Sequence, residues 1–233
     1  WLATSEAGEV ILNARKWDTV KSMFLDPFMG HVHNSRIHTN FNQTRSELGG
    51  AKPGRLSSNN PNMQFVPKRD KEVGRIIREI FIPDNDYIFV EYDHSQAEPR
   101  LFAHYSGEEV LVKGYSSTPF VDMHSIAAQL MGLTAQFGPE EGRKIAKNLN
   151  LGVLYTMGAE KLSKKLKIPF ERARGIIGQW HRTFPMGSSF TKRASDVAAE
   201  RQWVKTILGR RARFPDPRWS YRAANRIIQG SSA

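Results

Sequence analysis

The stretch at residues 142–158, GRKIAKNLNLGVLYTMG, is the most informative part of this sequence. Proline and two glutamates at positions 139–141 precede it, a composition typical of a helix start. Every fourth position then holds a cation, a second cation, an aliphatic side chain and an aromatic one, namely Arg143, Lys147, Leu151 and Tyr155. In an α-helix, four residues turn about 40° past a full circle and rise about 6 Å. The four side chains therefore lie along one face of the helix, which rotates slowly about the axis and extends over about 18 Å. That order suits a nucleoside triphosphate laid along the helix, with phosphates at the cationic end.

A basic amphipathic helix is more often only a solvated face over a buried stripe, and this stretch alone favours that simpler interpretation. Two further segments change the balance: VEYDHSQAEPR at residues 90–100 and GRLSS at residues 54–58. Together the three segments resemble the signature segments of family A DNA polymerases, the bacterial polymerase I group and its phage relatives. The resemblance runs from about residue 36 to the last residue. Three segments in the family's order, at plausible spacing, argue against a chance match.

The charge balance points to a polyanionic partner. The 233 residues contain 34 Lys+Arg against 23 Asp+Glu, a formal net charge of +11. This favours nucleic acid over an acidic membrane, and no apolar run approaches the length of a spanning helix. No signal-peptide pattern opens the chain, and the absence of cysteine excludes disulfides, thiolate metal sites and a cysteine nucleophile. Because the chain begins at Trp1 without a methionine, we expect a fragment of a longer protein.

The resemblance implies an α+β right-hand polymerase fold, with a partial palm sheet and a mostly helical fingers subdomain. The expected divisions are a thumb-to-palm connection at 1–35, a partial palm at 36–105 and fingers at 106–233. Periodicity and breaker residues predict local elements beside that assignment. The predicted strands are 37–43 and 87–92, and the predicted helices are 14–25, part of 68–80, a helix opening at Ser95, 142–158, 161–167, 171–184 and 187–205.

Asp93 follows the β-rich run at 87–92, and a carboxylate at a strand end beside a neighbouring carbonyl is well placed to hold Mg²⁺. Ser95 and Glu98 also match a capping box, so a purely structural role is the alternative. The resemblance implies two Mg²⁺ ions, or Mn²⁺ in their place, held by Asp93 and the His94 carbonyl. It also implies nucleotide contacts from Gln96 and Glu98, with Glu98 excluding a ribose 2′-hydroxyl. His94 and Pro99 stand where the family usually has Tyr and Leu. Because proline lacks a backbone N–H, the helix can start at a different residue than in the family.

The resemblance also assigns the residues that hold the incoming nucleotide. Arg143 and Lys147 match the family's R-x-x-x-K, which implies a grip on the β- and γ-phosphates and makes Lys147 the general acid for pyrophosphate. Leu151 stands where the family usually has Phe or Tyr against the sugar, and Tyr155 ends the row. His124 lies in a D-x-H segment that implies a phosphate contact, although a lone histidine is as often a packed residue.

Contacts to primer–template DNA are implied in three further segments. Arginine guanidinium groups and side-chain amides can donate hydrogen bonds to DNA phosphates and to acceptor atoms in the minor groove. The alternative is purely structural, because clusters of Ser, Asn and Pro or of Gly and Arg also form ordinary turns. The implied DNA-binding residues are Arg55, Asn62, Gln64, Arg210, Arg211, Asn225 and Gln229. The resemblance places Gly209, Arg210 and Arg211 in a hairpin near the template strand.

The implied reaction is transfer of a dNTP to a primer 3′-hydroxyl, which needs two metal ions and a second carboxylate beside Asp93. In the family that acid lies in a His-Asp hairpin after the glutamine-bearing helix, and Asp122 is a poor substitute because it belongs to the fingers. We therefore expect the rest of a longer chain or a partner chain to supply it, and these 233 residues alone not to extend primers.

The expected partners are primer–template DNA and dNTPs, with no membrane and a cytoplasmic, nucleoid-associated location. Two alternatives stay open: a non-catalytic module that holds duplex DNA, and a relative of the single-subunit RNA polymerases, which share R-x-x-x-K…Y.

Overall fold

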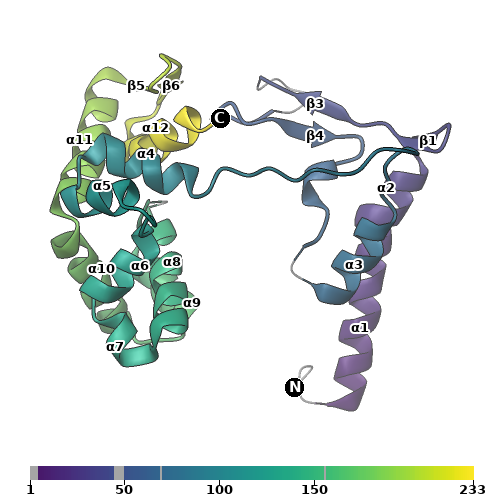
Figure 1. Ribbon diagram of the computed structural model, residues 1–233, viewed down its shortest axis with the longest axis horizontal. Coiled ribbons are helices and arrows are strands. Elements are labelled where there is room, and N and C mark those ends of the chain that lie inside the picture. The colour runs from purple at the N-terminus through teal and green to yellow at the C-terminus, as the bar shows by residue number, and fades with distance from the viewer. Residues whose placement is uncertain (1–4, 45–49, 69, 155) are drawn as a thin grey trace. The chain divides into compact units, whose positions relative to one another are not determined.

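The computed structural model describes residues 5–44, 50–68, 70–154 and 156–233. The chain divides into two compact units, Trp1–Tyr92 and Asp93–Ala233, which are described separately below (Figure 1). Helices and short antiparallel sheets both occur, so the predicted α+β class is confirmed. The division falls inside the segment predicted as palm, and the assignment of palm and fingers stays a prediction.

In the first unit a long helix packs on a short one. Helix α1 (Glu6–Val20) continues through a π-helical turn, Lys21–Leu25, into α2 (Asp26–Met29), so the predicted helix at 14–25 is confirmed as part of a longer one. Its buried side chains Val20, Phe24 and Phe28 recur at four-residue spacing and pack against α3 (Lys71–Glu79). Met23 lies beside these residues but is 56% exposed.

The strands of the first unit are short. Strand β1 (Val32–His33) pairs with β2 (Arg36–Ile37), and β3 (Asn40–Asn42) pairs with β4 (Ser57–Asn59), both antiparallel. The predicted single strand at 37–43 is therefore two strands, separated at His38 and Thr39.

The predicted strand at 87–92 is wrong for this structure. These residues carry no strand assignment, and no strand among the described residues pairs with them. Ile88 and Val90 are 82% and 81% exposed. A strand requires a hydrogen-bonding partner, so β propensity by itself leaves this run as exposed, irregular backbone.

The second unit is mostly helical around one core that includes Phe102, Leu149 and Trp180. Helix α8 (Pro139–Leu154) contacts α6 (Met123–Leu130) and α7 (Leu133–Phe137) most extensively. The helices of this unit are α4 (Ala97–Ser106), α5 (Glu109–Ser116), α6 (Met123–Leu130), α7 (Leu133–Phe137), α8 (Pro139–Leu154), α9 (Ala159–Leu166), α10 (Phe170–Thr183), α11 (Pro185–Arg201) and α12 (Ala223–Ser231). None of the described helices of the chain is long and apolar enough to span a membrane.

The predicted helices after α8 are confirmed, but the last of them is too long. Helix α11 ends at Arg201, because Gln202 takes a left-handed conformation at φ 62°. Strand β5 (Trp203–Lys205) follows and pairs antiparallel with β6 (Arg211–Arg213), which confirms the hairpin expected at Gly209–Arg211. A 3₁₀ segment, Pro217–Arg222, leads into α12.

Candidate nucleotide and nucleic-acid site

Helix α8 presents the predicted cationic row on its accessible side. Lys147 is exposed, and Arg143 and Leu151 are half-buried, whereas Ala146 and Leu149 are buried in the core. Tyr155, the last member of the predicted row, lies outside the described residues. The four-residue spacing read from the sequence therefore gives one accessible face with two cations near the helix N-terminus.

A buried polar network fixes the rotation of α8. Asn150 is fully buried, and its Oδ1 accepts a hydrogen bond of 2.7 Å from Trp180 Nε1 on α10. Its Nδ2 donates to Met123 O on α6 at 3.3 Å and lies 3.1 Å from His124 Nδ1. Because the tryptophan can only donate, the amide is oriented with Nδ2 toward the histidine, and His124 Nδ1 is the acceptor. Three helices are thus joined through one side chain.

His124 is a packed residue in this structure. It is 3% exposed, and burial lowers its pKa to about 4. The Asp122 carboxylate acts to raise this pKa, whereas the cations Arg143 and Lys147 lower it further. The imidazole is therefore neutral at neutral pH, with its proton on Nε2. A neutral ring can offer a hydrogen bond, but it adds no positive charge to the site.

Asp122 joins the D-x-H segment to the cationic row. Its carboxylate accepts from the backbone N–H groups of His124 (2.8 Å) and Ser125 (3.2 Å), which caps α6, and from Arg143 Nε and Nη2, both at 3.1 Å. Burial acts to raise the pKa of Asp122, but the two amides and the guanidinium outweigh it and hold that pKa below its ordinary value. The carboxylate stays ionised and orients Arg143.

A second set of contacts ties the start of α4 to α6. Tyr115 donates to Gln96 Oε1 at 2.8 Å and accepts from the Met123 N–H at 3.1 Å. Burial raises the pKa of Tyr115 to about 12, so the phenol keeps its proton. The Arg100 guanidinium lies 4.7 Å from the Tyr115 ring centre and 4.6 Å from that of Phe120. The residue before α4 is thus connected to α8 through Tyr115 and α6.

The predicted capping box at Ser95 is wrong. Helix α4 begins at Ala97, and Gln96 precedes it in a left-handed conformation, φ 56°, without a side-chain cap. Ser95 instead accepts through its carbonyl from Arg100 Nε at 3.0 Å. Pro99 falls in the first turn of α4, where a backbone N–H has no acceptor within the helix. The helix therefore starts later than a capping box at Ser95 would give, and the proline does not break it.

The segment before α4 offers oxygen ligands to a cation. Asp93 is exposed, and within the described ranges no ion pair or hydrogen bond involves its carboxylate. Next to it, His94, Ser95, Arg100 and Ser232 help to line a hollow of about 530 Å³. A free carboxylate and the adjacent His94 carbonyl fit a hard divalent ion as part of its ligand set. Among the described residues no cluster of three or more His, Asp or Glu side chains could hold a metal, so this set is incomplete here.

Comparison with known proteins decides the family. The sequence model described as DNA polymerase family A matches residues 2–233. The chain belongs to DNA polymerase family A. It is 31% identical over 97% of its length to the DNA polymerase DpoZ of Salmonella phage PMBT28, and 36% identical over 89% of its length to the thermostable DNA polymerase I of Thermus aquaticus.

A solved structure supports the fold of this family A chain. The POL domain of Pol1 from M. smegmatis, in complex with DNA primer-template and dNTP, matches 97% of the chain with a TM-score of 0.82 and 29% identity. The right-hand polymerase class expected from the sequence is thereby confirmed. The chain spans less than half of these proteins: 41% of the phage polymerase, 24% of the Thermus polymerase and 40% of the mycobacterial chain.

The DNA-binding residues predicted in the first unit of this family A chain surround one turn. Asn62 Oδ1 accepts from Ser58 Oγ and from the Gln64 N–H, both at 3.1 Å, and Gln64 Nε2 donates to Leu56 O at 3.0 Å. Both amides therefore shape the turn after β4, while the Arg55 side chain is exposed beside it.

The predicted DNA-binding residues in the second unit form two groups. Asn225 and Gln229 line a hollow of about 370 Å³ together with Lys161, Tyr221, Arg222 and Arg226. Arg210 and Arg211 are exposed on the β5–β6 hairpin, and the Arg211 guanidinium lies 4.6 Å from the Trp203 ring centre. The structure thus brings the amides of α12 to a cationic hollow.

Sequence reasoning missed the residues that hold this site together: Asn150, Tyr115, Arg100 and the pairing of Asp122 with Arg143. Asn150 carried a detectable signal, because it is a polar residue on the apolar side of an amphipathic helix. Tyr115 and Arg100 carried none, since their roles depend on contacts between separate helices.

Proposed function

We propose that this chain takes part in template-directed DNA synthesis, adding dNTPs to a primer 3′ end. The observation that carries the proposal is the accessible face of α8, where Lys147 and the oriented Arg143 lie one turn apart in a chain of DNA polymerase family A. The family match also favours a DNA polymerase over the single-subunit RNA polymerases, which share the helix pattern. The mycobacterial polymerase of similar fold holds DNA primer-template and dNTP.

In this proposal the α8 face receives the triphosphate. Arg143 and Lys147 bind the β- and γ-phosphates, and Lys147 donates a proton to the leaving pyrophosphate. Leu151 and Tyr155 contact the sugar and base. Gln96 and Glu98, at the start of α4, contact the nucleotide from the other side, and Glu98 excludes a 2′-hydroxyl. His124 contributes a hydrogen bond from its neutral ring rather than charge.

The proposal includes a divalent metal site at Asp93 and the His94 carbonyl. When bound, two Mg²⁺ ions activate the primer hydroxyl and neutralise charge on the triphosphate. A second carboxylate is required. We propose that it comes from parts of the polymerase outside these residues, or from a partner chain, since the described acids form no metal cluster. Arg55, Asn62, Gln64, Arg210, Arg211, Asn225 and Gln229 serve the primer–template in this proposal.

The nucleotide part of the proposal is tested by binding a fluorescent dNTP analogue with Mg²⁺ and with EDTA. Lys147→Ala should weaken binding about 10- to 100-fold, because it removes a charge-assisted contact to phosphate. Lys164→Ala, an exposed lysine on α9 paired with Glu160, is the matched control and should leave affinity unchanged. Equal effects of the two substitutions would contradict the assigned face.

The metal part needs a separate variant. Asp93→Asn should abolish the difference between Mg²⁺ and EDTA while leaving the metal-independent binding unchanged. Retention of the full Mg²⁺ effect in this variant would refute Asp93 as a ligand. Duplex DNA binding without any Mg²⁺-dependent nucleotide binding would instead support the non-catalytic DNA-binding module.

A further inference from the structure

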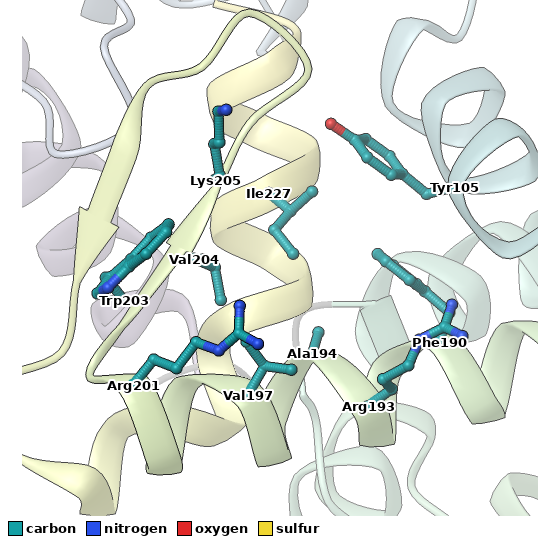
Figure 2. Close-up of a pocket in the computed structure, with 10 residues that line it drawn as sticks. All are labelled: Tyr105, Phe190, Arg193, Ala194, Val197, Arg201, Trp203, Val204, Lys205 and Ile227. Atoms are coloured by element: carbon teal, nitrogen blue, oxygen red, sulfur yellow. The ribbon is translucent and has the colours of Figure 1, made fainter.

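A cavity on the second unit is lined by none of the residues assigned above, although Arg211 lies over the ring of one lining residue, Trp203. It has a volume of about 350 Å³ and is formed by α11, strand β5, α4 and α12 (Figure 2). Its floor is apolar: Phe190, Val204 and Ile227 are each less than a tenth exposed. Figure 2 shows Tyr105 and Trp203 on opposite sides of this space.

Both aromatic side chains are held in place. Tyr105 stacks on Phe190 with 5.7 Å between ring centroids and 14° between ring planes, and its hydroxyl lies 2.8 Å from Ser231 Oγ. Trp203 belongs to the β5–β6 hairpin, where Arg211 lies over its ring. Aromatic surfaces fixed in this way need little further ordering when a flat ligand binds.

Three cations border the same cavity: Arg193 and Arg201 on α11, and Lys205 on β5. All three are exposed, and within the part of the chain that the structure describes no carboxylate forms an ion pair with any of them. Some exposed cations elsewhere on the second unit do have such partners, for example Lys113 with Glu109 and Arg218 with Asp216. The rim of the cavity therefore carries uncompensated positive charge above an apolar floor.

We propose that this cavity binds an unpaired nucleotide of single-stranded DNA, with the base between the Tyr105 and Trp203 sides and the flanking phosphates on Arg193, Arg201 and Lys205. Its volume lies at the lower end of the range for small-ligand sites, which suits one base and its sugar. Aromatic platforms beside a cationic track are the general means of binding single strands without sequence preference. The inference rests on the proposed function for the source of the strand, the unpaired part of a template.

The test compares a fluorescein-labelled oligo(dT) 12-mer with an abasic 12-mer of equal charge, by anisotropy in EDTA without dNTP. The intact chain should bind the oligo(dT) about tenfold more tightly, and Trp203→Ala should remove most of that difference. Arg201→Gln should reduce the dependence of log affinity on log salt by about 0.7, the value for one phosphate contact on a single strand. Lys192→Gln, the control, removes a charge from the same helix outside the cavity and should leave both properties unchanged.

A second measurement keeps the test decisive if Trp203→Ala perturbs the hairpin. An oligonucleotide that contains 5-iodouracil should photocrosslink to Trp203 or Tyr105, as mapped by mass spectrometry. Crosslinks found only elsewhere, or an unchanged salt dependence in Arg201→Gln, would overturn the proposal. An acidic aromatic peptide that binds through these residues while the oligonucleotide does not would also overturn it, in favour of a protein partner. The Mg²⁺-dependent dNTP binding assigned to Lys147 should persist in Arg201→Gln, so its loss in all variants would count against the proposed function and not against this cavity.

Discussion

Replacing Asn150 with leucine tests whether the buried network controls the nucleotide face. Leucine has a similar volume and good helix propensity, so Asn150→Leu changes mainly the hydrogen bonding. It removes the acceptor of Trp180 Nε1 and the donor to His124 Nδ1, now 2.7 and 3.1 Å away. Both partners are almost completely buried, so water cannot replace the lost contacts.

The expected loss follows from those two groups. A buried donor or acceptor left without a partner costs about 1–3 kcal/mol, and the leucine methyls return part of this by apolar burial. We expect a net loss of about 2–5 kcal/mol, well above the roughly 1 kcal/mol of an average substitution. Nucleotide affinity should fall as well, because α8 loses the contact that sets which side it turns to solvent.

Urea unfolding followed by circular dichroism measures the stability, and a double-mutant cycle isolates the cause. Trp180→Phe removes the indole N–H, so the double variant has no orphaned donor on α10. The double variant should therefore be more stable than the sum of the single effects by about 1 kcal/mol or more. Additive effects, or a loss below about 0.5 kcal/mol for Asn150→Leu, would refute the idea that these hydrogen bonds hold the helix.

Three further results are expected. Gly142→Ala should destabilise the chain by about 1–3 kcal/mol, because an added Cβ would meet the Leu133 backbone oxygen at 2.8 Å, whereas Gly175→Ala, with open space around it, should be neutral or slightly stabilising in the same unfolding assay. Stability should fall as pH drops from 6.5 toward 4, by about 3 kcal/mol in the limit, since the folded chain holds His124 neutral and the unfolded chain protonates it; a pH series that His124→Asn does not flatten would contradict this. If Leu151 contacts the sugar, Leu151→Phe should alter the ratio of dideoxynucleotide to deoxynucleotide affinity, and an unchanged ratio would remove that role.

Where the prediction from sequence failed, the outcome depended on partners distant in the chain. The run at 87–92 has strand propensity, but none of the described strands pairs with it, so it stays irregular. The pattern at Ser95 and Glu98 is a valid capping signal, yet the Tyr115 contact to Gln96 and the Arg100 contact to Ser95 O accompany a later helix start. Helix α11 was extended too far because its apolar pattern continues into β5, whose pairing with β6 decides its conformation.

The sequence by itself determined the existence of helices α8 to α11, the cationic row on α8, the polymerase family and the position of the β5–β6 hairpin. These are local properties, since side-chain periodicity, breaker residues and short motifs act within a few residues of one another. Only the tertiary structure decided that Asn150 and His124 are buried together, that Asp122 orients Arg143, and that Tyr105, Trp203 and three cations surround one cavity. Each of these depends on side chains that are far apart in the chain, and packing alone brings them within hydrogen-bonding or contact distance.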